Sequence, residues 1–148
     1  MTNASEPVLR LWRALAKRDW EAVKTVMSDD CIYVSMPFGP KVAVRGPDNI
    51  VKWIKLFAEH ENLAKVANRD VLLLTNGVDV MYEHVATWTS KNGETSNTPM
   101  VSVHKVTDDK VAVWKEYFDL AEIFDTTWTR SVGVGDANGM FDATDLIF

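Results

Sequence analysis

The sequence holds few side chains suited to acid–base chemistry inside its apolar stretches. The clearest is Asp119, which lies in the apolar run 111–120. A carboxylate in such a run must find a partner or its pKa shifts upward, and either outcome makes Asp119 a candidate catalytic group. The alternative interpretation is that Asp119 caps the end of a strand and serves the turn that follows.

A histidine and a tyrosine occupy comparable positions in other apolar runs. His84 lies in the middle of the run 80–89, where the alternation of a strand places Trp88 on the same face. A histidine can move a proton at neutral pH, although a hydrogen-bonded core or interface histidine is an equally good interpretation. Tyr33, with a phenolic pKa of about 10, is a natural donor to an oxygen that develops negative charge.

Other residues are expected to bind a substrate rather than to react with it. Six of the aromatic residues are tryptophans, whose flat side chains suit large cores and pockets for aromatic ligands. The candidate binding residues are Ser35, Trp53, Trp88, His104 and Tyr117. The face of the strand on which His104 lies stays open at this stage.

Neither a metal nor a cofactor is expected. The sequence contains no phosphate-binding loop, no dinucleotide-binding glycine run, no nucleophile elbow and no metalloprotease helix. Three histidines and one cysteine are too few for a structural zinc site.

The periodicity of the apolar residues predicts an α+β fold that positions these candidates. Helices are expected from a cap at Ser5, from a cap at Asp19 to the pair Asp29 and Asp30, and after the loop 45–48. Strands separated by tight turns are expected at 31–36, 66–74, 80–89, 100–106 and 111–120. Helices gathered first and hairpin-linked strands later predict a curved antiparallel sheet that forms a cone with the helices packed over it.

Length and composition set the remaining bounds. The 148 residues suit a single domain, with a core at 1–124 and a tail at 125–148 that docks over the pocket or across a dimer partner. A net charge of -5 leaves no basic surface for nucleic acid. Because no apolar run approaches the roughly 18 residues of a membrane span and no secretory signal is present, a cytoplasmic protein is expected.

Three segments, 33–37, 83–86 and 114–120, resemble the limonene-1,2-epoxide hydrolase family in their order and on this pattern of elements. That family belongs to the nuclear-transport-factor-2-like superfamily, together with ketosteroid isomerase and polyketide-cyclase-like proteins. The resemblance extends to about Phe124 and leaves the tail unmatched. It implies a homodimer formed through the sheet and chemistry on hydrophobic or aromatic molecules, generally without cofactors.

The resemblance also implies roles for individual residues. Tyr33 matches the tyrosine that holds the hydrolytic water, and Asp119 matches the aspartate that activates it. Three positions depart from the family pattern. Ser35 stands in place of an asparagine, His84 in place of an arginine, and Ala86 in place of the aspartate that donates a proton. Since alanine neither donates nor accepts a proton, the acid of the hydrolase is missing unless His84 supplies it.

The first hypothesis is therefore a cofactor-independent lyase or isomerase that acts by proton transfer on a hydrophobic, aromatic small molecule. In it His84 moves the proton, Asp119 is its partner and Tyr33 donates a hydrogen bond. Elimination of water or of a small aldehyde from an aryl alcohol is one concrete form. The alternatives are an epoxide hydrolase in which His84 protonates the oxygen, and a non-catalytic domain that binds a ligand or mediates assembly.

Overall fold

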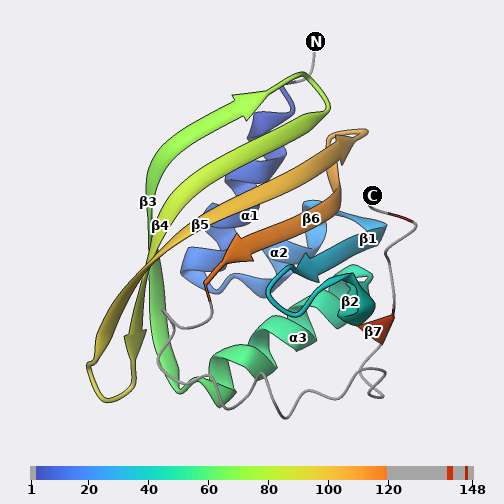
Figure 1. Ribbon diagram of the computed structural model, residues 1–148. Helices are drawn as coiled ribbons and strands as arrows, with labels where there is room; N and C mark the ends of the chain where they lie inside the picture. The colour runs from blue at the N-terminus through green and yellow to red at the C-terminus, as the bar shows by residue number, and fades with distance from the viewer. Residues whose placement is uncertain (1–2, 120–139, 142–145, 147–148) are drawn as a thin grey trace.

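The computed structural model describes residues 3–119, 140–141 and 146, and shows helices packed on a curved sheet (Figure 1). The helices are α1 (Ser5–Lys17), α2 (Trp20–Thr25) and α3 (Pro47–His60), with a short 3-10 helix, η1 (Pro40–Val42). The strands are β1 (Met27–Ser35), β2 (Ala43–Arg45), β3 (Leu63–Thr75), β4 (Asp79–Ser90), β5 (Thr95–Thr107), β6 (Lys110–Phe118) and β7 (Met140–Phe141). They form one sheet in the order β3-β4-β5-β6-β1-β2-β7.

The predicted α+β class is confirmed, but the sheet is mixed rather than antiparallel throughout. β1 pairs with β6 in parallel, with Tyr33 opposite Trp114 and Ser35 opposite Glu116. The physical reason is the long connection between the two strands, because α3 and three long strands separate them and parallel neighbours need such a crossover. This pairing sets residues of β1 beside residues of β6 on the inner face.

The first two helices differ from the prediction at their ends. α1 buries its apolar face as expected, but Ser5 is not its cap, because Ala4 occupies that position and the backbone N–H of Ser5 bonds to the side chain of Asn3. α2 begins after the predicted cap Asp19, whose side chain accepts from the backbone of Ala22. It ends at Thr25, and residues 27–30 open β1 instead of closing the helix.

The four long strands follow the predicted order, and their ends lie one to five residues beyond the predicted ranges, except that β6 ends at Phe118, two residues before the predicted end. Tight turns join them, as the sequence indicates. Gly77 and Gly93 have φ values of 98° and 85°, and Asp108 and Asp109 also lie in the left-handed region, with φ values of 51° and 59°. These turns hold the register that places side chains in rows across the inner face of the sheet.

Two such rows continue onto β1, and their residues on β6 and β1 line the site. One row consists of Val80, His104, Trp114 and Tyr33, and the next of Tyr82, Ser102, Glu116 and Ser35. α1 packs over the first row, and its Leu11 and Trp12 belong to the same buried cluster as Trp114. The core therefore lies between α1 and the sheet, directly beside the candidate site.

The predicted docking tail at 125–148 lies outside the described residues except for 140–141 and 146. Of these, β7 pairs antiparallel with β2, with Ala43 opposite Phe141. None of the described helices has both the length and the apolar character that crossing a membrane requires.

Candidate active site

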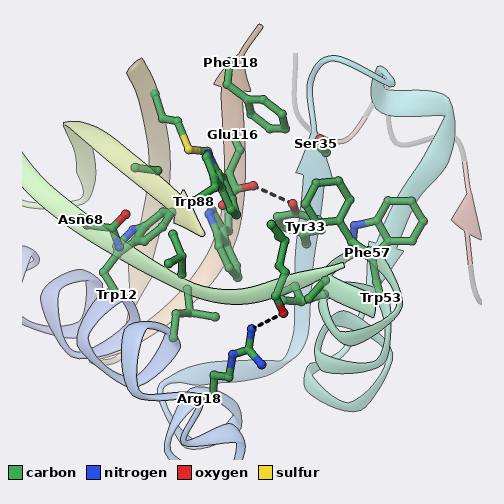
Figure 2. Close-up of a pocket in the computed structure, with 18 of the residues that line it drawn as sticks. Trp12, Arg18, Tyr33, Ser35, Trp53, Phe57, Asn68, Trp88, Glu116 and Phe118 are labelled. Carbon is green, nitrogen blue, oxygen red and sulfur yellow. Dashed lines mark hydrogen bonds between the residues drawn. The ribbon is translucent and has the colours of Figure 1, made fainter. Parts of the chain in front are cut away.

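A pocket opens between the inner face of the sheet and the three helices (Figure 2). About 830 Å³ of space lies inside the pocket and its open mouth, solvent included. All the tryptophans among the described residues line it, from the helices and from β4 and β6: Trp12, Trp20, Trp53, Trp88 and Trp114. Flat aromatic walls of this kind suit a flat apolar ligand.

The polar centre of the pocket wall is a hydrogen bond between Tyr33 of β1 and Glu116 of β6. The Tyr33 hydroxyl donates to Oε2 of Glu116 over 2.7 Å, and Figure 2 shows the two groups turned toward each other. The parallel pairing of the two strands brings these side chains together. Tyr33 is 5% exposed and Glu116 is 8% exposed, so the pair is shielded from bulk water.

Burial shifts the pKa of both partners upward. It raises the pKa of Glu116 from 4.5 to about 7, against the hydrogen bond from Tyr33 and the nearby indole N–H of Trp114, which favour the carboxylate. The pKa of Tyr33 rises well above its ordinary value, first through burial and then through the negative charge of Glu116. At neutral pH Glu116 is therefore present in both protonation states, whereas Tyr33 keeps its proton.

Four buried polar atoms on the pocket wall have no hydrogen-bond partner among the residues that the structure describes. They are Oγ of Ser35, Oδ1 of Asn68, and the indole Nε1 atoms of Trp88 and Trp114. Buried polar groups in folded proteins are almost always paired. Unpaired groups on the wall of a pocket are therefore available to a ligand.

The ionisable side chains of the pocket differ in their exposure to solvent. Arg18 and Lys65 line it from exposed positions, and Arg18 is held by a 3.0 Å hydrogen bond from Nη2 to the carbonyl oxygen of Leu63 (Figure 2). Among the described residues that line the pocket, Glu116 is the one carboxyl group. From these residues, a reaction in the pocket can draw on one acid–base carboxyl group, that of Glu116.

His84 and His104 lie beneath the pocket and not in its wall. The ring of Trp12 packs on His84 with centres 4.4 Å apart, and its indole N–H donates to Nε2 of His104 over 3.3 Å. His104 therefore carries its proton on Nδ1, which lies 3.4 Å from the carbonyl oxygen of Val80. Burial lowers the pKa of His84 to about 4 and that of His104 to about 3, so both rings are neutral at pH 7.

Asp119 and Tyr117 lie away from the pocket. Both are exposed, and Asp119 follows the last residue of β6. Side chains alternate along a strand, so Glu116 and Phe118 line the pocket and the residues after each of them face the other way. The structure thus does not bring Tyr33, His84 and Asp119 into one cavity, because only Tyr33 lines it.

The residues expected to bind a substrate divide in the same way. Ser35, Trp53 and Trp88 line the pocket, whereas His104 and Tyr117 do not. The open question about His104 is answered: it faces the helices, but it is packed under Trp12 at 1% exposure.

Among the wall residues that the sequence reasoning missed are Glu116 and Asn68. Glu116 lies two residues after Trp114, and strand alternation places both on the same inner face, so a signal was present. The sequence reasoning chose Asp119 instead, because Asp119 also lies in this apolar run and matches the family pattern. Asn68 carries no such signal, since it is an isolated amide in a strand whose other residues are mixed.

No group of three or more histidine, cysteine, aspartate or glutamate side chains that could hold a metal ion occurs in 3–119, 140–141 and 146. The chemistry available from the described residues that line the pocket is that of one carboxyl group, one phenol, two cationic side chains and several neutral hydrogen-bonding groups.

Solved structures with this arrangement of helices and strands include an LEH-like epoxide hydrolase from M. tuberculosis. It has a TM-score of 0.68 and 19% sequence identity, over 82% of this chain and 86% of that one. A Catenulispora acidiphila protein with a ketosteroid isomerase-like fold has a TM-score of 0.70 and 18% identity, over 80% and 88% of the two chains. A putative SnoaL-like polyketide cyclase from Shewanella putrefaciens has a TM-score of 0.72 and 12% identity, over 82% and 83%.

These likenesses establish a shared fold of the nuclear-transport-factor-2-like type. No curated protein sequence matches this chain. The family model of the SnoaL-like domain matches residues 8–114, which span most of α1, all of α2 and α3, β1 to β5 and about half of β6. This chain therefore belongs to the SnoaL-like domain family.

Proposed function

We propose that this protein is a cofactor-independent enzyme that transfers protons on a hydrophobic, aromatic small molecule, as a lyase or an isomerase. The observation that carries the proposal is the Tyr33–Glu116 hydrogen bond in the wall of an aromatic pocket. General acid–base catalysis is most efficient when the pKa of the group lies near the working pH. With a pKa of about 7, Glu116 meets that condition.

The proposed reaction begins with the ionised form of Glu116. The carboxylate removes a proton from a carbon of the substrate, and the electron pair of that C–H bond moves toward a neighbouring carbonyl oxygen. The protonated carboxyl is a weaker acceptor, so the Tyr33 hydroxyl turns to the substrate oxygen and donates to its negative charge. Glu116 then returns the proton to another carbon, which completes an isomerisation.

Elimination uses the same groups. The electron pair left on the carbon forms a double bond while a hydroxyl group leaves from the neighbouring carbon, and Glu116 gives its proton to that hydroxyl, which departs as water. Loss of a small aldehyde from an aryl alcohol is a related form. In these reactions Glu116 takes the proton-transferring role that the sequence assigned to His84, and no role is left for Asp119 in the pocket.

Epoxide hydrolysis is a second candidate, favoured by one observation. Ser35 lies opposite Glu116, and its buried hydroxyl has no partner among the described residues, so Ser35, Tyr33 and Glu116 could hold a water together. The wall position of Ala86 opposes it, since no acid stands there to protonate the leaving oxygen. Proton transfer by one carboxyl group needs no second acid.

The test is a mass-spectrometric screen of aryl alcohols, aryl ketones and aryl epoxides in ¹⁸O-labelled water, with chromatography to detect isomers. The wild-type protein is compared with Glu116→Gln and with the matched control Glu59→Gln, which alters an exposed residue of α3. We expect loss of mass or an isomer with the wild type and the control, and a rate lowered at least about 10²-fold in Glu116→Gln.

Other outcomes decide between the alternatives. Uptake of ¹⁸O into a diol that requires Glu116 would support epoxide hydrolysis instead. Conversion by Glu116→Gln at the wild-type rate would contradict the proposal, and binding without any conversion across the screen would favour a ligand-binding domain.

A further inference from the structure

The pocket contains a second polar site, on different strands from Tyr33 and Glu116. Asn68 of β3 and Trp88 of β4 both line the pocket, and Oδ1 of the first and Nε1 of the second are buried without a partner among the described residues. Asn68 lies opposite Ala86 and Val66 lies opposite Trp88. Asn68 and Trp88 are therefore diagonal neighbours on one face of an antiparallel pair, a spacing that long side chains bridge.

This site is separate from the reacting pair. β3 and β6 are three positions apart in the sheet, which corresponds to about 14 Å between their backbones at the usual strand spacing. Two strands, β4 and β5, therefore lie between the strand of Asn68 and the strand of Glu116. Figure 2 shows Asn68 and Glu116 on different parts of the wall, with aromatic side chains between them.

The two unpaired atoms differ in kind, and this difference selects the ligand group. The amide oxygen of Asn68 accepts a hydrogen bond, whereas the indole N–H of Trp88 only donates one. A hydroxyl group donates and accepts at the same oxygen, so it pairs with both. A carbonyl or a carboxylate would leave the amide oxygen unpaired, and an ammonium group could not accept from the indole.

We propose that Asn68 and Trp88 form a subsite for a hydroxyl group, and that the substrate is an aromatic molecule with a hydroxyl far from its reacting carbon. This inference rests on the proposed function, because it takes Glu116 as the group that reacts with a substrate bound in the same pocket. The hydroxyl fixes the orientation of the ring system, and the reacting carbon is presented to Glu116.

The test measures binding and not turnover, with 2-naphthol and 2-methylnaphthalene as probes of similar size with and without the hydroxyl. Dissociation constants come from quenching of tryptophan fluorescence. We expect the wild type to bind 2-naphthol about 10-fold more tightly, as two buried neutral hydrogen bonds allow. Asn68→Leu and Trp88→Phe should each lower this preference to about 3-fold or less.

Asn97→Leu is the matched control. Asn97 is an exposed residue of β5, so this substitution makes the same chemical change outside the pocket. It should keep the full preference. Circular dichroism tests whether each variant folds. If one pocket variant does not fold, the other variant and the ratio of the two dissociation constants of the wild type still test the proposal. Equal binding of the two probes by the wild type would overturn the proposal, as would a preference that survives in both pocket variants.

The two proposals fail separately. A hydroxyl preference that depends on Asn68 and Trp88 would stand even if Glu116→Gln retained full turnover. Conversely, a catalytic effect of Glu116→Gln would stand even if the probes bound equally.

Discussion

Glu116 is a carboxyl group whose charge depends on two opposing effects in its immediate surroundings. Burial favours the neutral acid, and the hydrogen bond donated by Tyr33 favours the carboxylate. Burial is the larger effect, which is why the pKa of Glu116 lies near 7 instead of near 4.5. The rate of a reaction in which Glu116 acts as the base should therefore rise with pH around neutrality.

Replacing Tyr33 by Phe tests this balance. Without the donated hydrogen bond the carboxylate is less stable, so the pKa of Glu116 rises further and the acidic limb of the kcat/KM profile moves to higher pH. Since the oxyanion donor is also lost, kcat should fall by about 10²-fold. The measurement is a pH–rate profile of both proteins on a substrate from the screen. A limb that stays in place or moves to lower pH would contradict the role given to Tyr33.

Some of the individual side chains of the site could be predicted from the sequence. Tyr33, Ser35, Trp53 and Trp88 could be placed from strand and helix periodicity, because each lies in a clear apolar pattern. The carboxyl group could not be chosen in the same way. Strand alternation sets Glu116 on the same face as Trp114, but only the pairing of β6 with β1 brings Glu116 beside Tyr33.

The two histidines beneath Trp12, His84 of β4 and His104 of β5, lie where these two strands pack against α1. Both rings are buried, and that burial lowers the pKa of His84 to about 4 and of His104 to about 3. In the unfolded chain both have the ordinary value of about 6.5. The unfolded state therefore binds more protons below pH 6.5, and stability is lost as the pH falls from there.

His84→Leu should weaken this acid sensitivity. Neither ring nitrogen of His84 has a partner among the described residues, so leucine leaves no polar group of the core unpaired. We expect the slope of unfolding free energy against pH to decrease by about 1.4 kcal/mol per pH unit between pH 6 and pH 4.5. Glu116 contributes the opposite slope in both proteins, because its pKa is raised on folding. Urea titrations at several pH values measure the difference, and identical slopes would contradict the assignment.

Helices and strands with a strong periodicity of apolar residues could be predicted from the sequence. Short elements, and segments where a helix gives way to a strand, could not. α1, α3 and the four hairpin strands carry one pattern over a whole element. At residues 20–30 the apolar pattern suits either a helix or a strand, and pairing of Met27 with Val111 decides for β1. The parallel pairing of β1 with β6 depends on contacts between distant segments, which no local pattern encodes.

At the scale of the molecule, the outer face of β3 and β4 carries exposed apolar side chains. Among them are Val71, Leu72, Leu74 and Met81, each 44% to 53% exposed, and Leu74 pairs directly with Met81. Apolar residues grouped on a sheet face are typical of a contact surface. Together with the family resemblance, this supports the proposal that a second copy of the chain covers the sheet.

Light scattering after size-exclusion chromatography tests this proposal. We expect a particle of twice the 16.7 kDa chain mass, and we expect Leu74→Glu to shift it toward the monomer because the charge must be desolvated in the interface. Leu56→Glu is the control, since Leu56 is an exposed residue of α3 at 39%. A wild-type monomer, or a dimer unaffected by Leu74→Glu, would contradict this arrangement.

The central claim is that one carboxyl group of the pocket exchanges its proton near neutral pH. It can be measured without a known substrate, by ¹³C NMR of protein labelled at the glutamate side-chain carboxyls and titrated from pH 4 to pH 9. The account predicts one resonance with a midpoint near 7 that is absent from Glu116→Gln. A titration in which every glutamate of the wild type has its midpoint below about 5, the ordinary range for this side chain, would contradict it.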